Sequence, residues 1–213
     1  MKSIFKTGTM IVAAMFAATS CSDFSDYNET PSTGNMSADK TLWENISQNE
    51  NLSDFANLVK KAGFEAALSQ SHFYTVWAPA NGTFDAQALM AEDSTKVLKE
   101  FVKNHIADYN HVISGAIDER IKVLNEKSYD FVGDGSYTYD GLNITTLNQP
   151  SINGIVHILN GAAQFYPNIY EHATSAEGLD SVVNFFKRYE IQTLDTKNSV
   201  LGPTVNGKQT YID

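Results

Sequence analysis

The order of the expected elements predicts an α+β domain built around an antiparallel sheet or sandwich. Helical patterns gather in the first half of the chain and short strand patterns follow, without strict alternation of strand and helix. The composition supports a folded core, because 42% of the 213 residues are apolar and 19% are charged. The length suits one domain, or one domain and a fragment of another.

The first residues favour an exported lipoprotein. A positively charged start, an apolar run over residues 10–18 and small residues precede Cys21, the only cysteine of the chain. The run is too short to span a bilayer as a helix. The segment resembles the lipobox of bacterial lipoproteins, although Ala18 stands where leucine is usual. We therefore predict a signal peptide over 1–20 and lipid attachment at Cys21; an incidental thiol is the alternative.

Residues 21–39 are predicted to form a flexible tether, because they are polar and lack apolar periodicity. Their acidic start, residues 22–26, resembles signals that send some lipoproteins to the cell exterior, and an ordinary solvated linker explains it equally well. We expect an outer-membrane lipoprotein that is exposed at the cell surface, with the periplasmic face as the alternative.

The net charge argues against a nucleic-acid partner. It is −10 for the whole chain, and loss of the two lysines within residues 1–20 lowers it to −12. No basic run offsets this charge, and an acidic surface repels phosphate backbones.

Apolar residues at helical spacing predict three helices in the first half of the globular part. The first begins near Thr41, and the second has Ser53 as its N-cap and Gly63 at its C-terminal end. The third runs from Ser94 to Asn104. A further amphipathic helix is expected over 179–189.

Short strands are expected between and after these helices. Their predicted ranges are Phe73–Ala78, which Pro79 closes, 121–124, 129–132, 137–139, 142–147 and 155–159. Turns are expected at Asn81-Gly82, at 133–135 and at Asn153-Gly154, where the pair favours a tight primed turn. Residues 205–208 predict one more hairpin.

Three segments in order resemble the fasciclin (FAS1) domain family. They are residues 75–84, which hold Pro79, Asn81 and Phe84; residues 98–106; and residues 153–159, which hold Asn153, Gly154 and His157. The resemblance spans about residues 40–170. It implies a wedge-shaped β-sandwich with helices packed along it. It also implies extracellular adhesion or scaffolding, often on a membrane anchor.

One position departs from this pattern. Animal members of the family carry a Tyr-His pair at the helix-to-strand junction that is tied to receptor adhesion. Here Asn104 stands in the tyrosine position and only His105 remains. We keep both residues as binding candidates and interpret His105 first as a structural residue.

Four aromatic residues alternate along the two arms of the predicted hairpin, so their side chains share one face of the sheet. They are Tyr129, Phe131, Tyr137 and Tyr139. Packing on the core is one interpretation. The other is an exposed platform for a sugar or protein, with Tyr137 and Tyr139 as its binding residues.

The sequence predicts no metal ion and no cofactor. The five histidines, at positions 72, 105, 111, 157 and 172, form no HxH or HExxH pair that would favour zinc. Asp130, Asp134 and Asp140 lie in a loop-rich stretch, but their spacing does not match a calcium-binding loop.

Non-enzymatic binding is the predicted function, since no nucleophile elbow, P-loop or dinucleotide fingerprint is present. The expected partners are the membrane, through the lipid, and a protein or glycan at the cell surface. Glycan capture beside an uptake system is an alternative, and a carboxylate-based hydrolase is the rival. The FAS1-like domain is assigned to 40–172. Residues 173–213 are assigned to a C-terminal helix and hairpin. Within them, residues 190–213 are expected either to pair with the FAS1-like domain or to begin a truncated second module, and a natural end of the chain is the alternative.

Overall fold

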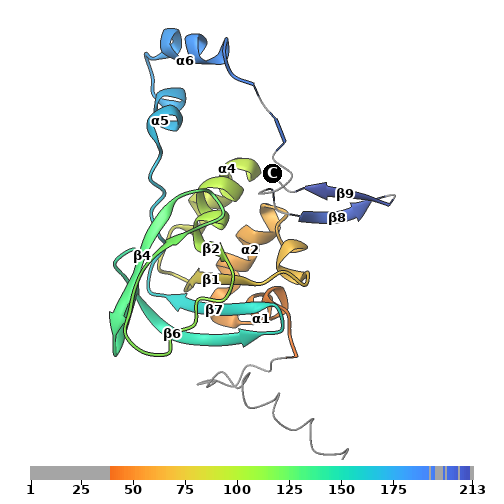
Figure 1. Cartoon of the computed structure of the whole chain (residues 1–213), viewed down its shortest axis with the longest axis vertical. Helices are drawn as coiled ribbons and strands as arrows, with labels where there is room; N and C mark the ends of the chain where they lie inside the picture. The colour runs from red at the N-terminus through yellow and green to blue at the C-terminus, as the bar shows by residue number, and fades with distance from the viewer. Residues whose placement is uncertain (1–38, 192, 195–198, 200, 206, 212–213) are drawn as a thin grey trace, which may run out of the picture. The chain divides into compact units, whose positions relative to one another are not determined.

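The computed structural model describes residues 39–191, 193–194, 199, 201–205 and 207–211 (Figure 1). The chain divides into two compact units, Met1–Ser32 and Thr33–Asp213, and all described residues belong to the second. The predicted signal peptide, Cys21 and the predicted tether up to residue 38 lie outside the described residues. No helix within the described ranges has the length and apolar character needed to cross a membrane.

Helical elements fill most of the first half of the domain, as predicted. Their bounds are α1 Leu42–Ser47, η1 Glu50–Leu52, α2 Ser53–Lys61, η2 Ala67–Ser69, α3 Ala86–Ala91, α4 Ser94–Lys96, η3 Val97–Val102 and η4 Lys103–His105. The predicted helix over 94–104 is therefore three consecutive helical segments, of which η3 is a π-helical turn. Its expected apolar face is confirmed, because Val97, Leu98, Phe101 and Val102 are buried.

The start of α2 differs from the prediction. Ser53 is the first helical residue rather than the N-cap, and Leu52 in the cap position offers no side-chain acceptor. Asn81 supplies the cap from the turn after β1: its Oδ1 accepts the Asp54 N–H at 3.0 Å, and its amide donates to Ser53 Oγ at 2.8 Å. A residue distant in sequence thus starts the helix.

The predicted end of α2 is confirmed. Gly63 has a φ of 69°, its N–H donates to Lys60 O, and the next N–H, of Phe64, donates to Val59 O. This is the paired hydrogen-bond pattern with which glycine closes helices.

Seven strands form one mixed sheet in the order β2-β1-β7-β6-β5-β4-β3. Their bounds are β1 Tyr74–Pro79, β2 Ile106–Asp108, β3 Ile117–Lys122, β4 Ser128–Asp134, β5 Ser136–Tyr139, β6 Leu142–Ser151 and β7 Gly154–Leu159. Neighbours are antiparallel except β1 and β7, which are parallel. The expected antiparallel pairing is wrong for this pair alone, because the long connection from β1 to β7 lets both strands run the same way.

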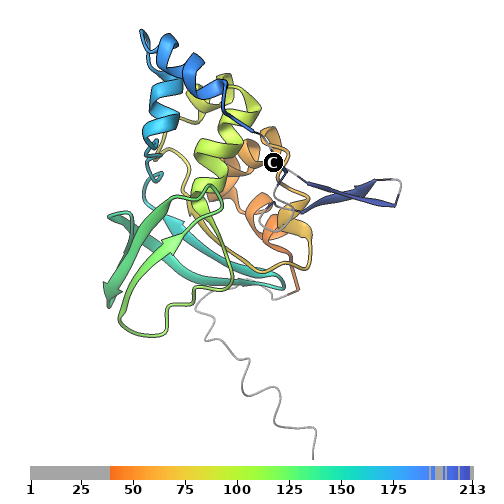
Figure 2. The ribbon, with the colours of Figure 1, turned by 45° about the horizontal axis from the view of Figure 1, so that its top comes forward.

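The sheet separates two apolar cores. On β1 and β7, Val76 and Val156 belong to the first core, which also holds apolar side chains of α1, α2 and η3. Figures 1 and 2 show the helices of the first half of the domain beside these strands. Trp77 and Leu159 point the other way and meet residues of β3, β4 and β5. These contacts show that the sheet folds back, so that β3, β4 and β5 cover one face of β1 and β7. Register shifts within β6 accompany this bend. Helices packed along a sandwich-like sheet confirm the predicted α+β class.

Two strand boundaries differ from the predictions. The strand expected at 121–124 is β3, which begins earlier and ends at Lys122. The expected turn at Asn153-Gly154 is formed by Ile152 and Asn153 instead, and Gly154 begins β7. Gly154 has a φ of 153°, and a Cβ there would lie 2.1 Å from Tyr74 O. The close approach of β1, rather than the turn, requires glycine at this position.

The C-terminal elements are α5 Ile169–Ser175, α6 Asp180–Lys187, β8 Leu201–Val205 and β9 Lys208–Tyr211. The helix expected over 179–189 is confirmed as α6, although it holds no buried residue. The hairpin expected around 205–208 is also confirmed. Within the described ranges, β8 and β9 pair with each other and add no strand to the large sheet.

Candidate ligand-binding cleft

The family junction is buried rather than exposed. His105 has no exposed surface; its Nδ1 donates to Phe101 O at 2.8 Å, and its Nε2 accepts the Ala163 N–H at 2.9 Å. These partners assign the neutral tautomer with hydrogen on Nδ1. Burial lowers the pKa of His105 to about 4. The interpretation of His105 as a structural residue fits this geometry.

Asn104 is the centre of a buried hydrogen-bond network. Its Nδ2 donates to Ala163 O at 3.1 Å, and its Oδ1 accepts from Asn125 Nδ2 at 2.8 Å and from the Tyr129 hydroxyl. Its backbone carbonyl accepts the Tyr139 hydroxyl at 2.9 Å. Both Asn104 and His105 have no exposed surface, so the structure places them beneath the surface, where a ligand does not reach them.

The aromatic hairpin face belongs mainly to the core. Tyr139 is fully buried, and its ring stacks on Trp77 with centroids 4.6 Å apart. Tyr137 is half-buried, and its hydroxyl donates to Gly115 O at 3.0 Å. The platform hypothesis is therefore wrong for Tyr139, because this face closes against β1 when the sheet folds back.

The remaining motif residues also hold the fold. The Asn153 amide donates to Leu68 O and Gln70 O, and its Oδ1 accepts the Leu42 N–H. His157 accepts the Asn148 N–H on Nδ1 and donates to His111 O from Nε2; burial lowers its pKa to about 4.

The ends of the first motif are likewise structural. Pro79 is the last residue of β1. Phe84 packs against Phe101 with ring centroids 5.3 Å apart.

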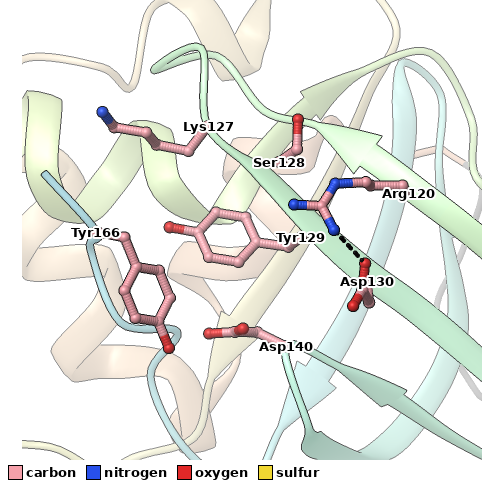
Figure 3. A pocket seen from close by; sticks show the side chains of 7 residues that line it. All are labelled: Arg120, Lys127, Ser128, Tyr129, Asp130, Asp140 and Tyr166. Carbon is pink, nitrogen blue, oxygen red and sulfur yellow. Dashed lines mark hydrogen bonds and ion pairs between the residues drawn. The ribbon is translucent and has the colours of Figure 1, made fainter. Parts of the chain in front are cut away.

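An open cleft of about 300 Å³ lies beside β3 and β4. Figure 3 shows Tyr129 between Tyr166 on one side and the Arg120–Asp130 pair on the other. The lining comes from β3, the turn between β3 and β4, β4, the turn after β5 and the loop before α5. It consists of Arg120, Lys127, Ser128, Tyr129, Asp130, Asp140 and Tyr166.

Asp140 is fixed by its backbone. It follows β5 in the left-handed region with a φ of 50°, which aspartate tolerates better than most residues. Its N–H donates to Asp130 O at 2.9 Å. Burial raises the pKa of the Asp140 carboxyl, and the negative charge of nearby Asp130 raises it further. A hydrogen bond from the Gln164 N–H lowers this pKa, but by less than burial raises it. The carboxyl group is therefore held rigidly at the cleft wall.

Three of the four charged side chains that line the cleft, those of Arg120, Lys127 and Asp130, form ion pairs. Arg120 and Asp130 are register partners on β3 and β4, and their side chains form an ion pair at 2.9 Å. Lys127 and Lys99 both contact the Glu171 carboxylate. Burial would raise the pKa of Glu171, but the hydrogen bonds from Lys127, the Asn168 N–H and Lys99 outweigh it and lower the pKa to about 2. The cleft thus presents two cations and two carboxyl groups with little net charge.

Part of this cleft was accessible to sequence reasoning. Tyr129, Asp130 and Asp140 were candidates, but for an aromatic face and for calcium. Alternation along β3 could have placed Arg120 beside Asp130, whereas no pattern marks Tyr166, which lies in a loop. Across the described part of the chain, no three His, Cys, Asp or Glu side chains converge as metal ligands would.

The mixed sheet, the helices packed along it and the buried junction agree with the fold that the resemblance to FAS1 domains implies. A sequence model of the Fasciclin domain matches residues 50–163, and the chain therefore belongs to the fasciclin domain family. A solved FAS1 domain pair from the insect cell adhesion molecule Fasciclin I is similar in fold at 15% identity and a TM-score of 0.46. That match covers 58% of this chain and 50% of that one, so the chain spans about half the length of that structure. Comparison with curated proteins gave no match.

Proposed function

We propose that the chain is a lipid-anchored binding protein of the bacterial cell envelope, whose FAS1 domain holds a protein or glycan without chemical turnover. The observation that carries this proposal is the order along the chain. A lipobox-like segment ending at Cys21 precedes a polar stretch and then a Fasciclin domain at 50–163. The family is typically related to cell adhesion and is generally non-catalytic.

The arrangement of the domain supports a scaffold that displays a separate ligand site. The motif residues of the family are engaged in packing, capping and buried hydrogen bonds. The open cleft instead exposes polar groups of Arg120, Asp130 and Asp140 and the ring of Tyr166. Binding residues commonly lie on loops that a rigid scaffold positions, as Asp140 and Tyr166 do here.

Location is tested on intact cells. We expect the mature protein to carry acyl chains on Cys21, to stay in the membrane fraction and to be degraded when protease is added outside the cell. The matched control is Cys21→Ser, which should leave the protein unlipidated. Wild-type protein without lipid in the soluble fraction contradicts the anchor, and protection from external protease places the domain on the periplasmic side.

A carboxylate-based hydrolase is the rival function, because Asp130 and Asp140 line one cleft and the Asp140 carboxyl has a raised pKa. Glycosidases use one protonated and one ionised carboxyl group. A glycan array and a turnover assay on the same sugars separate the two functions. Retention without cleavage supports binding, and cleavage that Asp140→Asn abolishes supports the hydrolase.

A further inference from the structure

We infer that the cleft binds an uncharged saccharide ring, which stacks on Tyr166 and exchanges hydrogen bonds with Asp140 and the Arg120–Asp130 pair. The inference rests on the proposed binding function and names the ligand class. It concerns a site outside the residues that the family motifs mark.

The size of the cleft limits its occupant. About 300 Å³ is at the lower end of the range for small-molecule sites. A stable protein partner buries roughly 800 Å² on each side, which this cleft does not offer. A single compact group, free or at the end of a longer chain, matches the space.

The charges select against an ionic occupant. Arg120 is paired with Asp130, and Lys127 is paired with Glu171. A phosphate, sulfate or uronate would meet the carboxyl groups of Asp130 and Asp140, and an ammonium group would meet the cations of Arg120 and Lys127. Side chains in ion pairs still donate and accept hydrogen bonds. A neutral ligand rich in hydroxyl groups can therefore replace its hydrogen bonds to water when it enters the cleft.

The hydrogen-bonding groups suit a sugar. Asp140 and Asp130 offer carboxylate acceptors, and Arg120 offers guanidinium donors in a fixed plane. Neighbouring hydroxyls on a sugar ring donate and accept together, so they complement such a mixed set. The backbone N–H of Gln164 and the left-handed turn hold Asp140 before any ligand arrives, which reduces the entropy lost on binding.

Tyr166 supplies the apolar contact. Its side chain is 52% exposed, although it sits beside the buried Tyr129 ring with centroids 6.3 Å apart. An aromatic face is electron-rich and favours groups with positively polarised hydrogens, which the C–H face of a sugar ring presents. A tyrosine left half-exposed at the edge of a polar cleft is therefore a stacking surface.

The test uses the full chain in a detergent that has no sugar headgroup. The probes are the methyl glycosides of glucose, galactose, mannose and N-acetylglucosamine, with glucuronate, glucosamine and inorganic phosphate as charged comparisons. Saturation-transfer NMR and titrations with tyrosine ring labelling report the binding. We expect at least one neutral glycoside to bind at millimolar concentration, to shift the Tyr166 ring signals and to outcompete the charged probes.

Variants then locate the site. Tyr166→Ala should weaken binding about tenfold, as loss of a central aromatic contact does, and Tyr166→Phe should restore it, because stacking needs the ring and not the hydroxyl. Asp140→Asn keeps a residue that tolerates the left-handed turn and should also weaken binding. Tyr189→Ala is the matched control, since Tyr189 is 72% exposed and does not line the cleft. Unchanged urea midpoints show that each variant is folded.

Three results would overturn the inference: no neutral glycoside binds, a charged probe binds more tightly than all of them, or Tyr166→Ala binds as well as Tyr189→Ala. In each case the lipid anchor and surface display can still hold. Conversely, wild-type protein that is found without lipid in the soluble fraction but still binds a neutral glycoside at Tyr166 would contradict the anchor and leave the saccharide site intact.

Discussion

Two helices of this chain, α2 and α6, have equally clear apolar stripes and opposite surroundings. In α2, Phe55, Leu58 and Val59 are fully buried against the sheet. In α6, no residue is buried, and the rings of Phe185 and Phe186 are 58% and 38% exposed. The comparison shows that periodicity predicts an apolar face but not whether the rest of the chain covers it.

The FAS1 body and the α5 region also differ in the ionisation state of the polar side chains that stabilise them. The FAS1 body buries two neutral histidines, His105 and His157, without a charged partner. The connection to α5 instead depends on an ionised carboxylate, Glu171, between Lys99 and Lys127. Acid should therefore act on the two regions in different pH ranges.

The largest predicted effect is acid destabilisation of the body. Because the folded pKa values of His105 and His157 are about 4, their stabilising effect is complete above the unfolded value near 6.5 and is lost as the pH falls toward 4. We expect the free energy of unfolding to fall by roughly 3 kcal/mol for each histidine by pH 4. Urea unfolding followed by the fluorescence of buried Trp77 measures it.

The packing of α5 on the body, through Glu171, should weaken at a lower pH than the body itself. The depressed pKa of Glu171 gives stability that is present above the unfolded value near 4.5 and is lost as the pH falls toward 2. Hydrogen exchange of the α5 amides reports this step. His172→Ala, at an exposed position of α5, is the control and should leave the first transition unchanged. A body whose stability is flat between pH 6.5 and 4 would contradict the prediction.

The second prediction compares the two apolar stripes directly. Phe55→Ala should lower the free energy of unfolding by about 4 kcal/mol, because it leaves a cavity in the helix-facing core. Phe186→Ala should change it by less than about 1 kcal/mol, because the ring is partly in water already. Equal losses in urea titrations would show that the α6 face is covered in solution.

Local patterns carried most of what the sequence could predict. The stripe of α2, the glycine that ends it and the hairpin at 133–135 depend on neighbours in the chain, and all three were predicted. The cap of α2 was not, because Asn81 acts across 27 residues. Gly154 was predicted to form a tight turn, but the structure requires glycine there because the Tyr74 carbonyl of β1 lies against it. Only the folded chain brings these two residues together.

The cleft shows the same limit more strongly. Its carboxylates were visible in the sequence, but their grouping depends on the register of β3 with β4 and on the turn after β5. Tyr166 comes from a loop that no periodicity describes. The buried junction illustrates the reverse case: Asn104 and His105 were candidates because of a family motif, and the structure uses them inside the domain.

The smallest predicted effect compares the N-caps of two helices: α2, which packs in the core, and α5, which lies outside it. Asn81 and Asn168 both cap a helix through Oδ1, onto Asp54 N and Glu171 N. Asn81→Ala should lower the free energy of unfolding by about 1 kcal/mol, because α2 cannot fray without exposing the core. Asn168→Ala should leave the urea midpoint of the body nearly unchanged and speed hydrogen exchange in α5 alone.

An aspartate at each position sharpens this comparison. Asn81→Asp keeps the Oδ1 acceptor for the α2 cap but loses the amide that donates to Glu50 O and Ser53 Oγ, so its loss should lie between wild type and alanine. Asn168→Asp loses no donor bond found in the described structure and places a negative charge at the start of α5, where it is favourable. If Asn168→Ala lowered the body's midpoint as much as Asn81→Ala, α5 would unfold together with the FAS1 core, and the distinction between the two regions would fail.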